Sequence, residues 1–290
     1  MCETNDLESW ARGGLTRRQM GVVGAAGMAA ACAPMASEGS DATARTGLIE
    51  RSVSFATPDG TLDGEFFARK GVKRPGVILW PDIAGIRPAK RQMARRLAEA
   101  GYAVLLANPY YRDVSGQQFA DFADFAGNGG WNRVTPWRGR FTAETILTDS
   151  RAIASWLRQQ KEVDTARGIG AQGYCMTGSF AVIAPAATPD LKAGASFHGG
   201  GLVRAGDTRS PHQMMEASSR YLIAIAQNDD AKAPGDKDAL REVAAAGKVA
   251  AEIEVYPADH GWCVPDSPSY NQAQAERAWA RLLATYRAAL

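Results

Sequence analysis

The residue with the clearest potential for chemistry is Cys175, which lies within the stretch Gly173–Gly178. The short apolar stretch Arg167–Gln172 precedes it, and Ser179–Ala184, which can open a helix, follows it. A strand joined to a helix by a Gly-x-Cys-x-x-Gly turn is typical of a nucleophile elbow, whose apex residue has a strained backbone and a raised side chain. The following helix N-terminus would stabilise the thiolate, which is the attacking form of cysteine. The stretch therefore predicts a nucleophilic cysteine, and the alternative is a small buried residue in a glycine-rich turn.

Two later stretches can supply the acid and the base that such a nucleophile needs. The apolar stretch Tyr221–Ala226 is followed by Asp229 and Asp230, and Ala251–Tyr256 is followed by His260, one of three histidines. The chain order of nucleophile, acid and histidine is the order found in α/β-hydrolases. We expect Asp229, which is nearer the strand end, to orient His260. Asp230 is the alternative.

Several motifs in sequence order give the chain a resemblance to the dienelactone hydrolase family. They are Trp80–Arg87, Asn108–Arg112, the elbow, Ser196–Gly200, an Asp-Asp-x-x-x-Pro loop at Asp229 and His260–Pro265, and they cover about residues 50 to 290. The resemblance implies an α/β class protein with the α/β-hydrolase fold, in which a mostly parallel central sheet carries helices on both faces. It also implies hydrolysis of small esters or lactones through a Cys-His-Asp triad and a thioester intermediate.

The expected reaction passes through a tetrahedral oxyanion, which needs preorganised N–H donors. The elbow would supply the backbone N–H of Met176, and the resemblance implies that of Ile83 as the second donor. Asp82 stands where the family usually has a glutamate near the cysteine. We therefore expect the Asp82 carboxylate to lie near Cys175, to repel the thiolate and to control when it forms.

The resemblance also implies supporting residues around the triad. Arg112 matches a family arginine associated with the substrate carboxylate, although an ordinary salt bridge is the alternative, and Tyr111 precedes it in the same motif. His198 is expected to line the site or to be a hydrogen-bonded structural histidine. No arginine follows His260 in the segment where the family enzyme carries one, which argues against dienelactone itself as the substrate.

Composition limits the other function classes. The formal net charge is only +2, so nothing suggests a nucleic-acid partner, and the four cysteines include no Cys-x-x-Cys pair that would indicate a metal site. We expect no cofactor, and a small-molecule ester or lactone as the partner. Two alternatives remain: the same triad could serve an acyltransferase or a peptidase, or the fold could carry a non-catalytic binding or redox protein.

The elements that must position these residues alternate between strands and helices. A hairpin around Pro58-Asp59-Gly60 is expected first, then buried strands and amphipathic helices. The expected strands are Gly76–Trp80, Tyr102–Ala107 and Lys192–Phe197, and the expected helices are Pro88–Ala100, Thr145–Gln160 and Ala273–Leu290. Residues 113–140 are expected to be mostly irregular, either as a lid over the site or as a packed excursion.

The N-terminal segment resembles an export signal. Arg17 and Arg18 precede a short, mildly apolar run that is too short to span a bilayer, a pattern typical of a twin-arginine signal. We divide the chain into a signal peptide at 1–36, a linker at 37–46 and the hydrolase domain at 47–290. An exported, periplasmic protein is expected, with membrane attachment only through export or a lipid anchor at Cys32. The alternative is an amphipathic helix that belongs to the fold.

Overall fold

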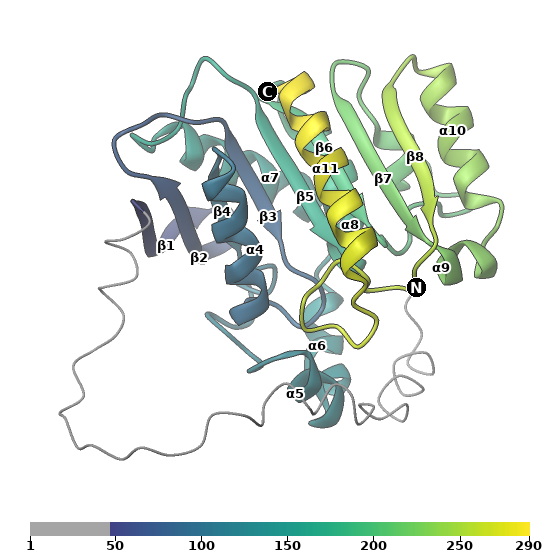
Figure 1. The fold of residues 1–290 in the computed structure, drawn as a ribbon, viewed down its shortest axis with the longest axis horizontal. Coiled ribbons are helices and arrows are strands. Elements are labelled where there is room, and N and C mark those ends of the chain that lie inside the picture. The colour runs from purple at the N-terminus through teal and green to yellow at the C-terminus, as the bar shows by residue number, and fades with distance from the viewer. Residues whose placement is uncertain (1–46) are drawn as a thin grey trace.

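The computed structural model describes residues 47–290, which form an eight-stranded sheet with helices on both faces (Figure 1). The strand order is β1-β2-β4-β3-β5-β6-β7-β8, with antiparallel pairing of β1 with β2 and of β2 with β4. The other neighbouring pairs are parallel. The expected mostly parallel sheet between two helical layers is confirmed.

The bounds of the elements agree with the expected alternation. The strands are β1 (Leu48–Thr57), β2 (Gly60–Arg69), β3 (Gly76–Trp80), β4 (Ala103–Ala107), β5 (Ile169–Tyr174), β6 (Leu191–Phe197), β7 (Arg220–Ala226) and β8 (Ala250–Tyr256). The α-helices are α4 (Pro88–Glu99), α5 (Phe122–Gly127), α6 (Gly130–Arg138), α7 (Ala143–Arg158), α8 (Gly178–Ile183), α9 (Gln227–Lys232), α10 (Asp236–Ala246) and α11 (Gln272–Ala289). Short 3-10 turns are η1 (Cys175–Thr177), η2 (Ala184–Ala187) and η3 (Pro211–Met214).

Two layers of helices bury the two faces of the sheet. Helices α4 and α11 lie on one face, in front of the sheet in Figure 1, and α7 and α8 lie behind it. On the first face Leu97 and Tyr286 pack in one apolar cluster with Val104, and on the second Ile153 and Leu157 pack with residues of β3 and β5. The central strands are apolar throughout because they are covered on both sides.

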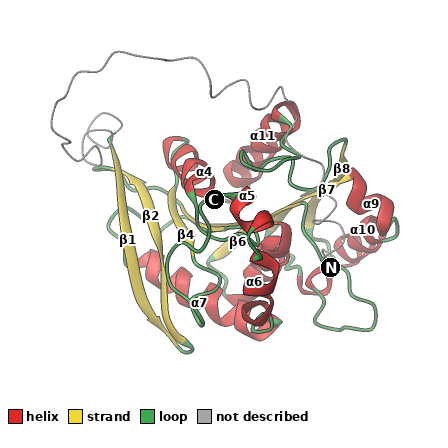
Figure 2. Cartoon of the chain, turned by 90° about the horizontal axis from the view of Figure 1, so that it is seen from below, coloured by secondary structure: helices red, strands yellow, loops and turns green. Residues whose placement is uncertain are grey.

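Pairing register brings the ends of the central strands together. Trp80 pairs with Gly173, Tyr174 with Phe197, and Ala226 with Tyr256. Each strand is followed directly by a loop or a helical turn that carries a predicted site residue, so these segments meet at the carboxyl edge of the sheet, where open α/β sheets bind ligands. Asp229 lies in the first turn of α9 and not in the expected loop. Helices α5 and α6 lie at this edge, below the strand ends in Figure 1 and toward the viewer in Figure 2.

Residues 113–140 are more regular than expected. They contain α5 and α6, and the Asp121 side chain caps α5 by accepting a hydrogen bond from the Asp124 backbone N–H. Phe119, Phe125 and Val134 are fully buried in a cluster that also contains Ile83 and Cys175. Of the two alternatives, the described contacts support a packed excursion, whose core reaches the predicted nucleophile.

The predicted signal peptide at 1–36, the linker at 37–46, the twin-arginine pair and Cys32 lie outside the described residues, and these assignments stay predictions. Within residues 47–290 no helix is both long and apolar enough to cross a membrane.

Candidate active site

The elbow at the end of β5 has the geometry that its glycines predict. Cys175 has a φ of 55°, a left-handed conformation that a side chain adopts only under strain. A Cβ on Gly173 would collide with the backbone carbonyl of Thr177, and one on Gly178 would lie 2.5 Å from the Cα of Gly199. The turn therefore requires glycine at both positions, and it holds Cys175 at the edge where the site loops meet.

Thr177 ties the elbow to the loop after β3. Its Oγ1 accepts a hydrogen bond of 3.0 Å from the backbone N–H of Tyr174 and lies 2.8 Å from the carbonyl oxygen of Pro81, to which it can donate. The hydroxyl thus fixes the elbow against the segment that carries Asp82 and Ile83.

The predicted base and acid are in contact. His260 Nδ1 lies 2.6 Å from Asp229 Oδ2, and the His260 backbone N–H donates a 2.8 Å hydrogen bond to Asn228 Oδ1. Asp230 instead pairs with Lys237, at 2.8 Å. An Nδ1–H donor to Asp229 leaves Nε2 of His260 as a proton acceptor.

His260 and Cys175 line the same cavity at the strand ends, together with Ile83, Asp82 and His198. His260 is 7% exposed and Cys175 is 5% exposed. The base and the thiol are therefore both largely shielded from solvent, an environment in which electrostatic interactions are strong.

His198 supports the elbow. Its Nδ1 accepts a 3.1 Å hydrogen bond from the Cys175 backbone N–H, which places the ring proton on Nε2. Its ring lies edge-on to the His260 ring with centroids 4.6 Å apart. Burial, and then the neighbouring His260, hold the pKa of His198 well below its usual range, so the ring is neutral. This geometry suits the hydrogen-bonded structural role rather than that of a general base.

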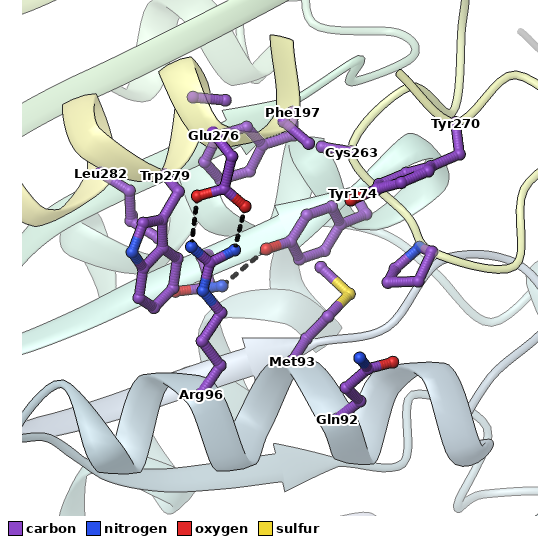
Figure 3. A pocket seen from close by; sticks show the side chains of 14 residues that line it. Gln92, Met93, Arg96, Tyr174, Phe197, Cys263, Tyr270, Glu276, Trp279 and Leu282 are labelled. Carbon is purple, nitrogen blue, oxygen red and sulfur yellow. Dashed lines mark hydrogen bonds and ion pairs between the residues drawn. The ribbon is translucent and has the colours of Figure 1, made fainter. Parts of the chain in front are cut away.

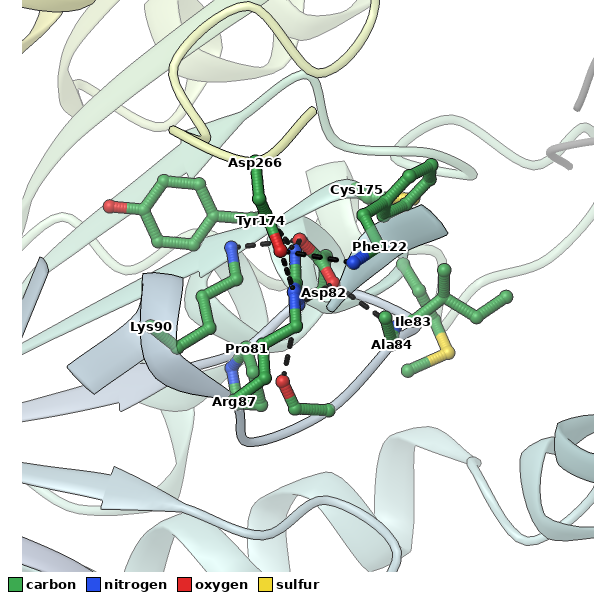
Figure 4. A network of polar contacts seen from close by, with 12 residues as sticks. Pro81, Asp82, Ile83, Ala84, Arg87, Lys90, Phe122, Tyr174, Cys175 and Asp266 are labelled. Carbon is green, nitrogen blue, oxygen red and sulfur yellow. Dashed lines mark hydrogen bonds and ion pairs between the residues drawn. The ribbon is translucent and has the colours of Figure 1, made fainter. Parts of the chain in front are cut away.

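Asp82 belongs to a buried ion network (Figure 4). Its carboxylate oxygens lie 2.7 Å from Arg87 Nη1 and 2.8 Å from Lys90 Nζ, and Arg87 also pairs with Asp266 at 2.7 Å. Burial alone would raise the pKa of Asp82, but the charges of Arg87 and Lys90 hold it well below its usual range. The Asp266 carboxylate also accepts the backbone N–H of Phe122 at 3.0 Å.

This network corrects the expected role of Asp82. The side chain does line the cavity of Cys175, but two cations balance its charge, so it is not the isolated anion that was expected to repel the thiolate. Asp82 instead shapes its own loop by accepting the backbone N–H of Ala84 at 3.0 Å. Through Arg87 and Asp266, it connects the loop after β3, the start of α5 and the loop after β8.

The two expected oxyanion donors come from residues that border one hollow. Ile83 and Met176 line the same cavity as Cys175. The Tyr110 hydroxyl donates a 2.7 Å hydrogen bond to the Ile83 carbonyl oxygen, which fixes the peptide that follows Ile83. Tyr110 is fully buried in the cluster that contains Cys175, so the tyrosine beside the site is Tyr110 and not the predicted Tyr111.

Tyr111 and Arg112 lie elsewhere, in contrast to the prediction. The Tyr111 hydroxyl donates a 2.6 Å hydrogen bond to Asp149, and the Arg112 guanidinium donates two hydrogen bonds to the same carboxylate and one of 2.7 Å to Asp59. Neither residue lines the two cavities that contain Cys175. The ordinary salt bridge, which was the alternative for Arg112, is therefore what the structure contains.

Cys263 faces a different cavity from Cys175. It lines a hollow between α4 and α11 together with Met93, Tyr174 and Trp279 (Figure 3). Burial raises the pKa of the Cys263 thiol to about 12, so it is protonated at neutral pH. Neither cysteine forms a disulfide. Within residues 47–290 no group of three or more His, Cys, Asp or Glu side chains could hold a metal ion.

Sequence reasoning missed several residues that hold the site together. Arg87 and Lys90 are completely buried, although charged residues next to a predicted helix start are usually solvated. Asn228 directly precedes Asp229, and Asp266 directly follows Pro265. This closeness to motif residues was the only signal for them in the sequence.

Comparisons with known proteins agree with the geometry. Residues 62–290 match the family model described as the dienelactone hydrolase family. A protein of Escherichia coli K12 is 26% identical over 214 residues, which cover 72% of this chain and 75% of that protein. One of Methylorubrum extorquens is 24% identical over 264 residues, covering 89% and 87%. Both carry the name "Putative carboxymethylenebutenolidase".

The fold is also similar to solved structures. A crystal structure named "Putative Dienelactone Hydrolase", from Klebsiella pneumoniae, superposes with a TM-score of 0.69 at 23% identity, covering 83% of this chain and 98% of that one. The expected α/β-hydrolase fold is thereby confirmed.

Proposed function

The chain belongs to the dienelactone hydrolase family and is a carboxylic ester hydrolase, and on that premise we propose that Cys175, His260 and Asp229 form its catalytic triad. The observation that carries the proposal is the 2.6 Å contact of His260 Nδ1 with Asp229, made by a histidine that shares a cavity with Cys175. This contact sets the tautomer in which Nε2 can accept the thiol proton.

The proposed reaction has two halves. His260 Nε2 takes the proton from Cys175, and the thiolate attacks the acyl carbon of an ester or lactone. The backbone N–H groups of Met176 and Ile83 stabilise the tetrahedral oxyanion. The intermediate collapses to a thioester as the alcohol oxygen leaves with the proton from His260.

In the second half, His260 activates a water molecule, which attacks the thioester carbon. The C–S bond breaks, the carboxylic acid is released, and the proton returns to Cys175. The buried thiol and base, together with the ion network that connects three site loops, support such a reaction because they hold the reacting groups in one arrangement.

The test is a comparison of Cys175→Ala with Cys263→Ala, a matched change at the thiol that faces the other cavity. Initial rates on a panel of small esters and lactones would be measured with circular dichroism as a folding check. We expect Cys175→Ala to abolish turnover, and Cys263→Ala to keep most of it. Substantial turnover by folded Cys175→Ala protein would rule out the proposed nucleophile.

A further inference from the structure

Cys175 lies between two hollows of very different size. We name the first the His260 pocket; it has a volume of about 20 Å³, and its walls include His260, Phe122 and Val264. We name the second the arginine groove; it has a volume of about 680 Å³, and its walls include Phe141, Phe180, Arg138 and Arg204. Cys175 and Ile83 belong to both.

The proposed chemistry assigns one part of an ester to each hollow. His260 returns its proton to the leaving oxygen, so the alcohol part must lie on the His260 side of the scissile carbonyl. The acyl part must then extend to the other side of Cys175, into the arginine groove. The His260 pocket is much the smaller of the two hollows, so we assign the smaller part of the ester, its alcohol, to that side, whereas the groove has the size of an ordinary ligand site.

The charged side chains that line the arginine groove are all positive. Its described walls contain two arginines and no aspartate or glutamate. No carboxylate within residues 47–290 pairs with Arg138, whose guanidinium lies 5.4 Å from the centre of the Trp131 ring. Arg204 is 44% exposed, and its contact with the Asp207 carboxylate is long, at 3.7 Å.

Other arginines near the site differ from this pair. Arg87 is bound by the carboxylates of Asp82 and Asp266, and Arg112 by those of Asp149 and Asp59. Their charges are neutralised inside the protein. The arginine groove therefore offers the positive charge of Arg138, which pairs with no described carboxylate, and that of Arg204, which pairs with Asp207 only at 3.7 Å. Phe141 and Phe180 provide apolar surface beside them.

We propose that the arginine groove binds the acyl part of an anionic substrate, with Arg138 and Arg204 recognising a carboxylate carried by that acyl group. The substrate class is then a half-ester of a dicarboxylic acid with a small alcohol. This inference rests on the proposed function, because it uses the position of His260 to orient the ester. It assigns substrate recognition to residues other than Arg112.

Two isomeric esters test the orientation directly. Monomethyl glutarate carries its carboxylate on the acyl part, whereas 4-acetoxybutanoate has the same formula and charge but carries it on the alcohol part. We expect a higher kcat/KM for monomethyl glutarate. An equal value, or a preference for 4-acetoxybutanoate, would overturn the assignment of the two hollows.

Charge recognition is tested with Arg138→Gln and Arg204→Gln. Each should lower the ratio of kcat/KM for monomethyl glutarate to that for neutral methyl butanoate by about fivefold, the size expected for one partly exposed charge contact, mainly through KM. The matched control is Arg140→Gln, since Arg140 is 61% exposed, pairs with Asp113 and lies outside the groove. An unchanged ratio in both groove variants would overturn the proposal.

A binding readout separates failure of this inference from failure of the proposed function. Alkylation of Cys175 by iodoacetamide would be followed by peptide mass spectrometry with glutarate or uncharged glutaramide present at constant ionic strength. Glutarate should slow the alkylation in wild type and less so in the arginine variants. If neutral esters are hydrolysed but glutarate protects no better than glutaramide, only this inference fails. If no ester is hydrolysed and Cys175 is no more reactive than Cys263, both fail.

Discussion

Replacing Asp82 by asparagine removes the central charge of the buried ion network. The carboxylate contacts Arg87 and Lys90 at 2.7 and 2.8 Å, and both cationic side chains are fully buried. Arg87 would keep Asp266 as a partner, but Lys90 has no other carboxylate within ion-pair distance among the described residues. Asp82→Asn therefore leaves an ammonium group uncompensated in the protein interior.

The loss of stability expected for Asp82→Asn can be calculated from the unpaired charge that it leaves on Lys90. Breaking a buried ion pair from one side costs about 3–5 kcal/mol of the free energy of unfolding, because the remaining charge stays desolvated. In a domain of this size, about 1 kcal/mol lowers the melting temperature by about 2–4 °C, so the expected loss is about 6–20 °C. Substituting Lys90→Met in the same chain should recover part of the loss, since the unpaired charge is then gone.

The stabilisation that Asp82 contributes is lost in acid. Arg87 and Lys90 hold the pKa of Asp82 below its usual range in the folded protein, so its stabilisation is fully present above about pH 4 and is lost as the pH falls below that value. The difference in stability between wild type and Asp82→Asn should thus shrink as the buffer is made more acidic than about pH 4.

Urea unfolding of wild type, Asp82→Asn, Lys90→Met and the double variant measures these quantities. Asp59→Asn is the control, because Asp59 is an ion-pair partner of Arg112 whose side chain is 40% exposed. A loss below about 1 kcal/mol for Asp82→Asn, or additive effects of the two substitutions, would refute the account of the network.

Three further substitutions test the site. Asp229→Asn should lower kcat/KM on small esters by about 10²–10⁴-fold, because it removes the acceptor that fixes the His260 tautomer. Asp230→Asn loses only a pair with a lysine and should change kcat/KM less than about threefold. The opposite ranking would move the role to Asp230. Gly173→Ala should give little soluble, active protein, since its Cβ would collide with a backbone carbonyl of the elbow; near-normal activity in a soluble preparation would contradict that geometry. Arg112→Gln should lower thermal stability by several degrees and leave KM for ester substrates unchanged, because its guanidinium is bound to two carboxylates away from Cys175; a raised KM without loss of stability would return Arg112 to the substrate.

The sequence predicted the parts of the site that depend on local patterns. The elbow follows from a short apolar strand and two glycines whose hydrogens alone fit the turn. Asp229 and His260 lie within four residues of the ends of β7 and β8, and parallel pairing of these two strands brings such positions together. The order of the motifs along the chain already indicates the order and direction of the strands, and the positions of Asp229 and His260 follow from it.

The residues that the sequence did not predict depend on tertiary contacts. Lys90 lies on the same face of α4 as Ala94 and Leu97, but a lysine at such a position becomes buried only if a carboxylate from another segment meets it. Tyr110 and Tyr111 are adjacent in the chain, and the loop geometry directs only Tyr110 toward the site. Neither outcome follows from residue type or spacing.

The measurement that bears most directly on the central claim is mass spectrometry of acid-quenched enzyme during turnover of a small ester. The account predicts a mass increase equal to one acyl group on the peptide that contains Cys175, lost on treatment with hydroxylamine as expected of a thioester. The adduct should be absent from Cys175→Ala and unaffected by Cys263→Ala. An acyl group on any other residue, together with full activity of Cys175→Ala, would contradict the assignment of Cys175 as the nucleophile.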